Sequence, residues 1–288
     1  MGDAPARAWV LNLDAELELA RPGYVRSPEV SAHLRTYAAQ AMALLGPDDV
    51  CVGSRDVDGW PGRAWCPTPL ALEALCRAGA VPEPHPELSV LKAVNHRRFG
   101  FELGGGPPGA TYVTTVGAVE DLLASQPRDW LCKRAFGFAG RGQLRLRHRI
   151  EAHQRVFIER SIAGDGLLLE PLVAPTLELA LHGFLWPDGR TKLGRPCVQR
   201  VGPRGTWLGS RLVRAGELTP SEDEALHASA ERVAAALVAR GYFGPFNVDA
   251  YRYQLQGASG FCALGEINAR YSMGFPIGFG RSTSELEL

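Results

Sequence analysis

Two β-rich runs near the end of the chain, joined by a short polar turn, most constrain how this sequence can fold. The first run ends GYFGPFNVDAYRY at 253, the second is GFCALGEINARYSMGF at 260–275, and Gln-Gly-Ala-Ser-Gly stands between them. Runs of this kind around a glycine-containing turn predict an antiparallel hairpin. With the turn centred near Gly257, Asp249 lies opposite Gly265 or Glu266.

Three oxygen-bearing side chains are expected to meet on one face of this hairpin. Side chains two residues apart on a strand share a face, and directly opposed residues have Cβ atoms about 4.5–5.5 Å apart. Asp249, Glu266 and Asn268 should therefore converge, with Arg270 just beyond them. Oxygen donors that include carboxylates suit Mg²⁺. The alternative is that these acids are solvated residues of a half-exposed strand.

The segment GEINARYSMG at 265–274 resembles the closing motif of ATP-grasp enzymes. In that family a Glu-x-Asn pair and an acid on the neighbouring strand ligate Mg²⁺ around ATP, and several members carry an arginine two residues after the asparagine. The resemblance implies that Asp249, Glu266 and Asn268 hold the metal and that Arg270 is catalytic.

A glycine-rich loop, GFAGRG at 137–142, follows a predicted strand at 129–135 that carries Lys133. Glycines let backbone N–H groups approach phosphate oxygens closely, although no G-K-[ST] ending makes this a Walker A loop. The alternative is a flexible hairpin tip. ATP-grasp enzymes have the same order, a lysine-bearing strand and then a mobile glycine-rich lid. The resemblance thus implies a catalytic, phosphate-contacting Lys133 and nucleotide contacts from Gly137, Gly140, Arg141 and Gly142.

The short apolar strand LLLEPLV at 167–173 is similar to the hinge where ATP-grasp enzymes bind adenine. The resemblance implies adenine contacts from Glu170, Pro171, Leu172 and Val173, and a ribose contact from Glu178. The alternative for Glu178 is a solvent-facing place on an alternating strand. Many members begin the grasp region with a lysine, where this chain has Asn-His-Arg-Arg at 95–98, so Arg98 is the expected phosphate contact.

The first eighty residues alternate between strand and helix patterns. Strands are predicted from 8 and at 50–53, and helices at 27–46 and 68–79, each opened by Ser-Pro or Thr-Pro. This alternation favours a small parallel α/β domain, with an irregular α+β unit as the alternative. The proline-rich stretch 81–86 is the expected linker, and 91–103 is expected to form one amphipathic helix. The sequence GGGPPG at 104–109 is a turn, because it follows a helix rather than a strand.

The expected fold class is therefore α/β, an α+β grasp. A small Rossmann-like pre-ATP-grasp domain (1–90) precedes an ATP-grasp domain (91–288), whose lid subdomain covers about 110–166 and whose base covers about 167–288.

Composition excludes several classes of function. The chain has 31 basic and 31 acidic residues among 288, and this balance gives no reason to expect nucleic acid or an anionic membrane as partner. Its six cysteines stand singly without a C-x-x-C pair, which favours free thiols in a reducing compartment, hence the cytoplasm. No signal-peptide region and no apolar run near the ~20 residues of a membrane span are present.

The predicted function is an ATP-dependent ligase that activates a carboxylate as an acyl phosphate and joins it to an amine. Two alternatives are an ATP-grasp kinase that stops at a phosphorylated small molecule, and a nucleotide-binding protein without turnover. The expected cofactors are ATP and Mg²⁺, and the expected partners are small-molecule or peptide carboxylates and amines, with a homodimer as is common in the family. Candidate contacts to the substrate carboxylate are Arg200, Arg204 and Arg211, and the alternative is that they are scattered surface charges.

Overall fold

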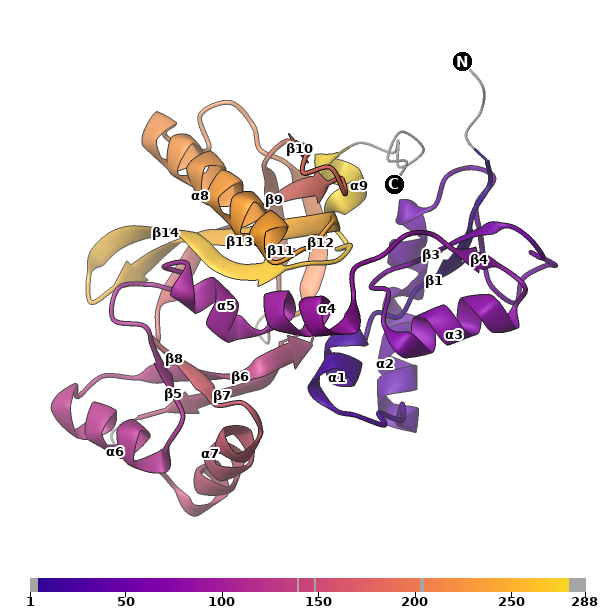
Figure 1. Ribbon diagram of the computed structural model, residues 1–288. Coiled ribbons are helices and arrows are strands. Elements are labelled where there is room, and N and C mark those ends of the chain that lie inside the picture. Colours follow the sequence, from indigo (N-terminus) through magenta and orange to yellow (C-terminus); the bar gives the residue numbers. More distant parts are fainter. Residues whose placement is uncertain (1–4, 139, 148, 203–204, 280–288) are drawn as a thin grey trace.

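The computed structural model describes residues 5–138, 140–147, 149–202 and 205–279, and within this part of the chain there are three separate sheets, each with helices beside it (Figure 1). The first sheet belongs to the N-terminal unit, the second contains the glycine-rich hairpin, and the third contains the C-terminal hairpin. No helix among these residues is both long and apolar enough to cross a membrane.

The N-terminal sheet is parallel, as predicted, with strand order β2-β1-β3-β4. Its strands are β1 (Ala8–Val10), β2 (Val50–Cys51), β3 (Pro61–Ala64) and β4 (Val81–Pro82), and its helices are α1 (Ala15–Ala20), α2 (Pro28–Ala41), the 3-10 turn η1 (Met42–Leu44) and α3 (Pro69–Arg77). The hydroxyl of Ser27 caps α2 by accepting from the amide of Val30 at 3.2 Å. The predicted linker is wrong at its start, because Val81 and Pro82 form an edge strand, where proline is tolerated.

The helix predicted over 91–103 is two helices, α4 (Leu88–Asn95) and α5 (Arg97–Glu102). His96 between them is extended, with φ −74° and ψ 129°, and its imidazole accepts from the amide of Arg98 at 3.1 Å. Asn95 fixes the break from the other side, since its Oδ1 accepts from the amide of Ala269 at 2.9 Å. The last residue of α4 is therefore held by a contact with Ala269, which lies 174 residues further along the chain.

The second sheet is antiparallel, with order β5-β8-β6-β7. Its strands are β5 (Thr111–Val113), β6 (Trp130–Phe138), β7 (Arg141–Leu146) and β8 (Leu167–Pro171). Helices α6 (Val116–Ser125) and α7 (Ala152–Gly164) pack on one face around a separate apolar cluster that includes Trp130 and Ile158 (Figure 1). We call this unit the lid. The glycine-rich loop is the turn between β6 and β7.

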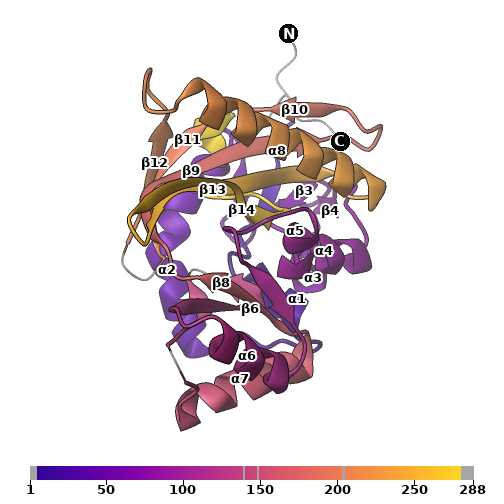
Figure 2. The same cartoon turned by 90° about the vertical axis from the view of Figure 1, so that its left-hand side faces the viewer.

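The third sheet, called the base, has order β12-β11-β9-β13-β14, with β10 paired to β9. Its strands are β9 (Ala174–Leu185), β10 (Thr191–Leu193), β11 (Cys197–Val201), β12 (Trp207–Leu212), β13 (Gly244–Leu255) and β14 (Ala258–Asn268), followed by the short helix α9 (Phe275–Gly278). Helix α8 (Pro220–Ala239) covers the face turned away from the lid (Figure 2). The predicted capping box of Thr219 and Glu222 opens it.

The C-terminal hairpin is antiparallel, as predicted, and of the two expected partners of Asp249 the structure has Glu266; Asn247 lies opposite Asn268. The chain reverses at Gln256 and Gly257, both with positive φ, 51° and 85°. Between Asp249 and Tyr251 the register shifts, so that residues 263–265 of β14 stand against one residue of β13. All six cysteines lie among the described residues, and none forms a disulfide.

Candidate active site

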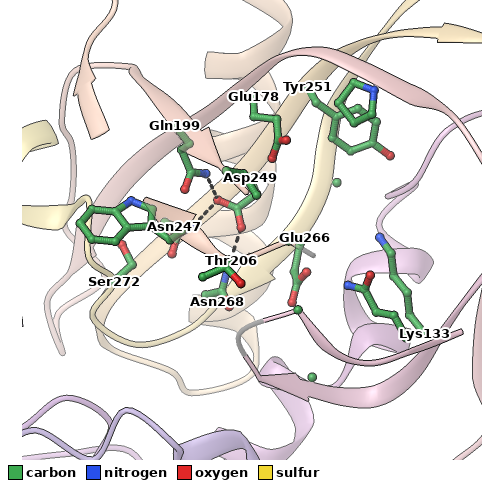
Figure 3. Close-up of a pocket in the computed structure, with 18 of the residues that line it drawn as sticks. Lys133, Glu178, Gln199, Thr206, Asn247, Asp249, Tyr251, Glu266, Asn268 and Ser272 are labelled. Atoms are coloured by element: carbon green, nitrogen blue, oxygen red, sulfur yellow. Dashed lines mark hydrogen bonds between the residues drawn. The ribbon is translucent and has the colours of Figure 1, made fainter. Parts of the chain in front are cut away.

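A cavity of about 1100 Å³ lies where the base, the lid and the N-terminal unit meet (Figure 3). Strands β9, β11, β13 and β14 form one wall, the β6–β7 hairpin and the segment after β8 form another, and side chains of the N-terminal unit close the remaining side. Of the residues predicted for a site, those that line it are Lys133, Gly137, Gly140, Glu170, Pro171, Leu172, Val173, Glu178, Asp249, Glu266, Asn268 and Arg270.

The predicted metal ligands converge on the base side of this cavity (Figure 3). Asp249 accepts from three amides: Gln199 and Asn247 donate to its Oδ1 at 2.7 and 2.9 Å, and Asn268 donates to its Oδ2 at 3.2 Å. Glu266 stands directly opposite Asp249 on the neighbouring strand. The two amide side chains of Gln199 and Asn247 were not anticipated, because a neutral amide in a strand carries no distinctive sequence signal.

Burial, reinforced by the charge of Glu266, raises the pKa of Asp249 to about 7. The negative charge of Glu266 thus opposes ionisation of Asp249, and a divalent cation between the two side chains would offset that repulsion. Among the described residues, no three His, Cys, Asp or Glu side chains cluster as a metal site. The candidate donors are instead two carboxylates and the amide oxygen of Asn268, which in this structure accepts from Arg270. Oxygen donors of these kinds fit a hard cation such as Mg²⁺ that keeps part of its water shell.

Arg270 is buried beside this set. Its Nη2 donates to Asn268 Oδ1 at 3.1 Å, its Nη1 donates to the carbonyl of Tyr271 at 2.8 Å, and it forms an ion pair with Glu16 of α1. Glu16 was not predicted from the sequence, because it lies 254 residues away from its partner. The only feature of the sequence that could have indicated a buried partner for Arg270 is that Glu16 stands in a short, largely apolar stretch, AELEL at 15–19.

Lys133 reaches the cavity from β6, where its ammonium forms an ion pair with Glu170 of β8 at 2.7 Å. Both side chains are buried, and Glu170 Oε1 has no hydrogen-bond partner among the described residues. A buried acceptor without a donor is costly, so this oxygen is available to a ligand that enters the cavity. Glu178 lines the opposite wall from β9, and burial raises its pKa.

The predicted phosphate contact Arg98 does not reach the cavity. Its side chain is exposed, pairs with Glu102 at 2.8 Å and lies over the ring of Tyr112. The preceding residue, Arg97, points inward instead: it donates to the carbonyl of Arg134 at 2.9 Å and pairs with Glu266 at 2.9 Å. Successive helical residues point about 100° apart, so the break at His96 decides which arginine faces the site.

The glycine-rich loop is built around Arg97. A Cβ on Gly137 would lie 2.2 Å from Arg97 Nη2, so a larger residue would displace the guanidinium from its present place. The tip of the β6–β7 hairpin also lies close to the base. A Cβ placed on Gly205 of the base would be 3.3 Å from the Cα of Gly140 at this tip. Arg141 and Gly142, predicted as nucleotide contacts, belong to β7 and do not line the cavity. Ala139 lies outside the described residues.

No protein-family model and no curated protein matches this sequence. Solved structures do match the fold. D-alanyl-alanine synthetase A from Vibrio cholerae has a TM-score of 0.60 at 14% identity, covering 99% of this chain and 96% of that one. Pyruvate carboxylase from Rhizobium etli has a TM-score of 0.58 at 16% identity over 95% of this chain, which spans a quarter (25%) of the carboxylase.

The biotin carboxylase domain of the Hydrogenobacter thermophilus 2-oxoglutarate carboxylase, in complex with MgADP, ADP and bicarbonate, has a TM-score of 0.55. It is 13% identical and covers 96% of this chain and 66% of that one. The chain has the ATP-grasp fold. The resemblance stated for its closing motif is thereby confirmed for the fold, and the cavity lies between the two clasping sheets of that fold.

The arginines expected to contact a substrate carboxylate in this ATP-grasp fold are placed elsewhere. Arg200 donates to the carbonyl of Leu208 at 3.3 Å, and Arg211 pairs with Glu217 at 2.6 Å; neither lines the cavity. Arg204 lies outside the described residues. Arg97, Lys133 and Arg270 are the basic side chains that meet acids at the cavity wall.

Proposed function

We propose that this protein is an ATP-dependent ligase that activates a carboxylate as an acyl phosphate and joins it to an amine. The observation that carries this proposal is the convergence of Asp249, Glu266 and Asn268 in a cavity that Lys133 and the glycine-rich tip also line. Oxygen donors on one wall and a lysine with backbone amides on the other suit a metal-bound polyphosphate.

We assign the nucleotide to the end of the cavity between β8 and the β6–β7 hairpin. Pro171, Leu172 and Val173 offer an apolar surface for the base, and the partnerless oxygen of Glu170 can accept from an exocyclic amine. Glu178 is proposed for the ribose. The phosphates then extend toward Asp249 and Glu266, where these acids and Asn268 would hold Mg²⁺, which supplies charge neutralisation for phosphoryl transfer when bound.

Arg97, Lys133 and Arg270 are proposed to stabilise the transferring phosphoryl group. Each is held by an acid: Arg97 by Glu266, Lys133 by Glu170 and Arg270 by Glu16. Side chains fixed in this way need little reorganisation when negative charge develops beside them. Arg97 takes the role that the sequence analysis gave to Arg98.

In the proposed reaction an oxygen of the substrate carboxylate attacks the γ-phosphorus of ATP, and ADP leaves. The nitrogen of the amine then attacks the acyl carbon, inorganic phosphate leaves, and the amine gives up a proton. The lid tip, close to the base at Gly140 and Gly205, would exclude water from the acyl phosphate. A similar structure that holds MgADP supports the choice of nucleotide and metal.

The division into a pre-ATP-grasp domain (1–90) and an ATP-grasp domain (91–288) is part of this proposal. So is a cytoplasmic location, which the free thiols support because such thiols persist in reducing compartments.

The direct test mixes the protein with MgATP, a panel of carboxylic acids and hydroxylamine, which captures an acyl phosphate as a hydroxamate. We expect acid-dependent ADP release together with hydroxamate in the wild type and in Glu224→Gln, an exposed acid of α8. We expect neither in Glu266→Gln. A stable phosphorylated product without hydroxamate would select a kinase, and full turnover in Glu266→Gln would refute the metal assignment.

A further inference from the structure

Part of the cavity wall is apolar. Five of its lining side chains belong to a single hydrophobic cluster that joins the N-terminal unit to the base. We call them the apolar wall: Leu13, Leu34, Tyr37, Trp65 and Met273. Four of the five come from the N-terminal unit, so this unit supplies a surface that the lid and the base do not.

The apolar wall is adjacent to the proposed reaction centre. The guanidinium of Arg270 lies over the ring of Trp65, with 5.5 Å between its central carbon and the ring centroid, and donates to Asn268 on its other side. The amide of Tyr271 also donates to the carbonyl of Trp65 at 3.1 Å, which ties Trp65 to the end of the metal-bearing hairpin. A group attached to a carboxylate held at Arg270 would therefore meet Trp65 first.

None of the five side chains of the apolar wall is charged. Among the described residues that line the cavity, the acids are on β13, β14, β9 and the hinge, and the basic residues other than Arg270 are Arg97 and those of the lid strands. Arg270 itself is already paired with Glu16. A charged side group placed against Leu34, Tyr37 and Trp65 would lose its hydration without gaining a partner, which is unfavourable. An aliphatic or aromatic group would gain from burial.

We propose that the acid activated by this protein carries a large apolar side group, aliphatic or aromatic, which the apolar wall selects. This inference rests on the proposed ligase function and adds the chemical class of its first substrate. The carboxylate stands at Arg270, the phosphates lie on the hinge side, and the side group extends toward α2. A hydrophobic amino acid or a peptide ending in one has this chemistry.

The experiment compares acids that carry apolar side groups with acids whose side groups are charged or absent, in the hydroxamate assay. L-Leucine, L-phenylalanine and 4-methylpentanoate represent apolar side groups, and L-aspartate, L-lysine and acetate represent charged or absent ones. We expect kcat/KM to be at least about tenfold higher for the apolar set, since a well-filled hydrophobic pocket discriminates by about that factor or more. Preference for aspartate or lysine, with hydroxamate still formed, would overturn the inference and leave the ligase function standing.

Variants of the apolar wall provide the second arm. Tyr37→Ala should raise the KM for the apolar acids about tenfold without changing the KM for ATP. The half-buried Tyr37 tolerates truncation better than Leu34, which is 8% exposed and packs in the core. Leu70→Ala is the matched control, an exposed leucine of the same unit that does not line the cavity. Equal effects from Tyr37→Ala and Leu70→Ala would overturn the inference.

A binding measurement separates this inference from the ligase chemistry. L-Phenylalanine is titrated calorimetrically into the protein in the presence of MgADP, with wild type, Tyr37→Ala and Leu70→Ala compared. Binding that only Tyr37→Ala weakens supports the inference even if no acid yields hydroxamate, in which case the proposed function alone fails. Absence of both binding and hydroxamate with the apolar acids overturns it.

Discussion

Removing Glu16 should destabilise the protein far more than removing an exposed acid, because Glu16 is the partner of a buried arginine. The side chains of Glu16 and Arg270 are only 6% and 14% exposed. Burial raises the pKa of Glu16, so the charged carboxylate is itself costly to keep there. The pair as a whole therefore contributes little net stability. Removing Glu16 alone, however, leaves Arg270 buried without its counter-charge, which lowers the free energy of unfolding by about 3–5 kcal/mol.

Glu16→Ala is expected to lower the free energy of unfolding by about 3–5 kcal/mol in urea denaturation near neutral pH. The matched control is Glu73→Ala. Glu73 pairs with Arg77 on α3 of the same unit, and their side chains are 60% and 72% exposed, so that this change should cost under about 1 kcal/mol.

The double variant Glu16→Ala/Arg270→Met gives the decisive comparison. Because it removes both charges, it should be more stable than Glu16→Ala alone. A loss below about 1 kcal/mol in Glu16→Ala, or a double variant that loses the sum of the two single effects, would refute the reasoning that Arg270 depends on Glu16 for its counter-charge.

Three further predictions concern the contact of Arg97 with the β6–β7 hairpin and an ion pair of the base. Arg97→Met should weaken MgATP binding at least about tenfold in calorimetry, whereas Arg98→Met should leave it unchanged; equal effects would return the phosphate role to Arg98. Gly137→Ala should weaken the same binding, because its Cβ would displace the guanidinium of Arg97, and wild-type affinity would contradict that packing. The side chain of Arg252 holds the pKa of Glu222 down to about 2, below its ordinary 4.5. This pair therefore stabilises the fold above about pH 4.5 and loses that effect as the pH falls toward 2. Arg252→Met should flatten the acid side of a urea-midpoint profile, and an unchanged slope would show that the pair is not linked to folding.

The hairpin that carries Asp249 and Glu266 was predictable from the sequence, because its turn and its strands have recognisable local patterns. A glycine-containing turn sets the register, and the two-residue period of a strand sets the faces. Those rules place Asp249 opposite Gly265 or Glu266. The observed partner is Glu266, and a register shift between Asp249 and Tyr251, which the local rules do not predict, brings the two together. The capping residues Ser27 and Thr219 similarly marked the starts of α2 and α8.

What the sequence could not show depends on contacts between distant segments. The break at His96 depends on Asn95 bonding to Ala269, and this break directs Arg97 rather than Arg98 into the cavity. The pairing of Glu16 with Arg270 joins α1 to the end of β14. Neither contact produces a pattern in the neighbouring sequence. Helix periodicity and motif spacing therefore could not identify the residues that position the side chains of the site.

The central claim is that Asp249, Glu266 and Asn268 form a divalent-cation site for a nucleotide's phosphates. Calorimetric titration of ADP into the protein, with and without Mg²⁺, tests it most directly, using wild type, Glu266→Gln and the exposed control Glu224→Gln. We predict that Mg²⁺ strengthens ADP binding in the wild type and the control, and that this dependence disappears in Glu266→Gln. ADP binding with the same Mg²⁺ dependence in all three proteins, or no binding to the wild type, would contradict the account.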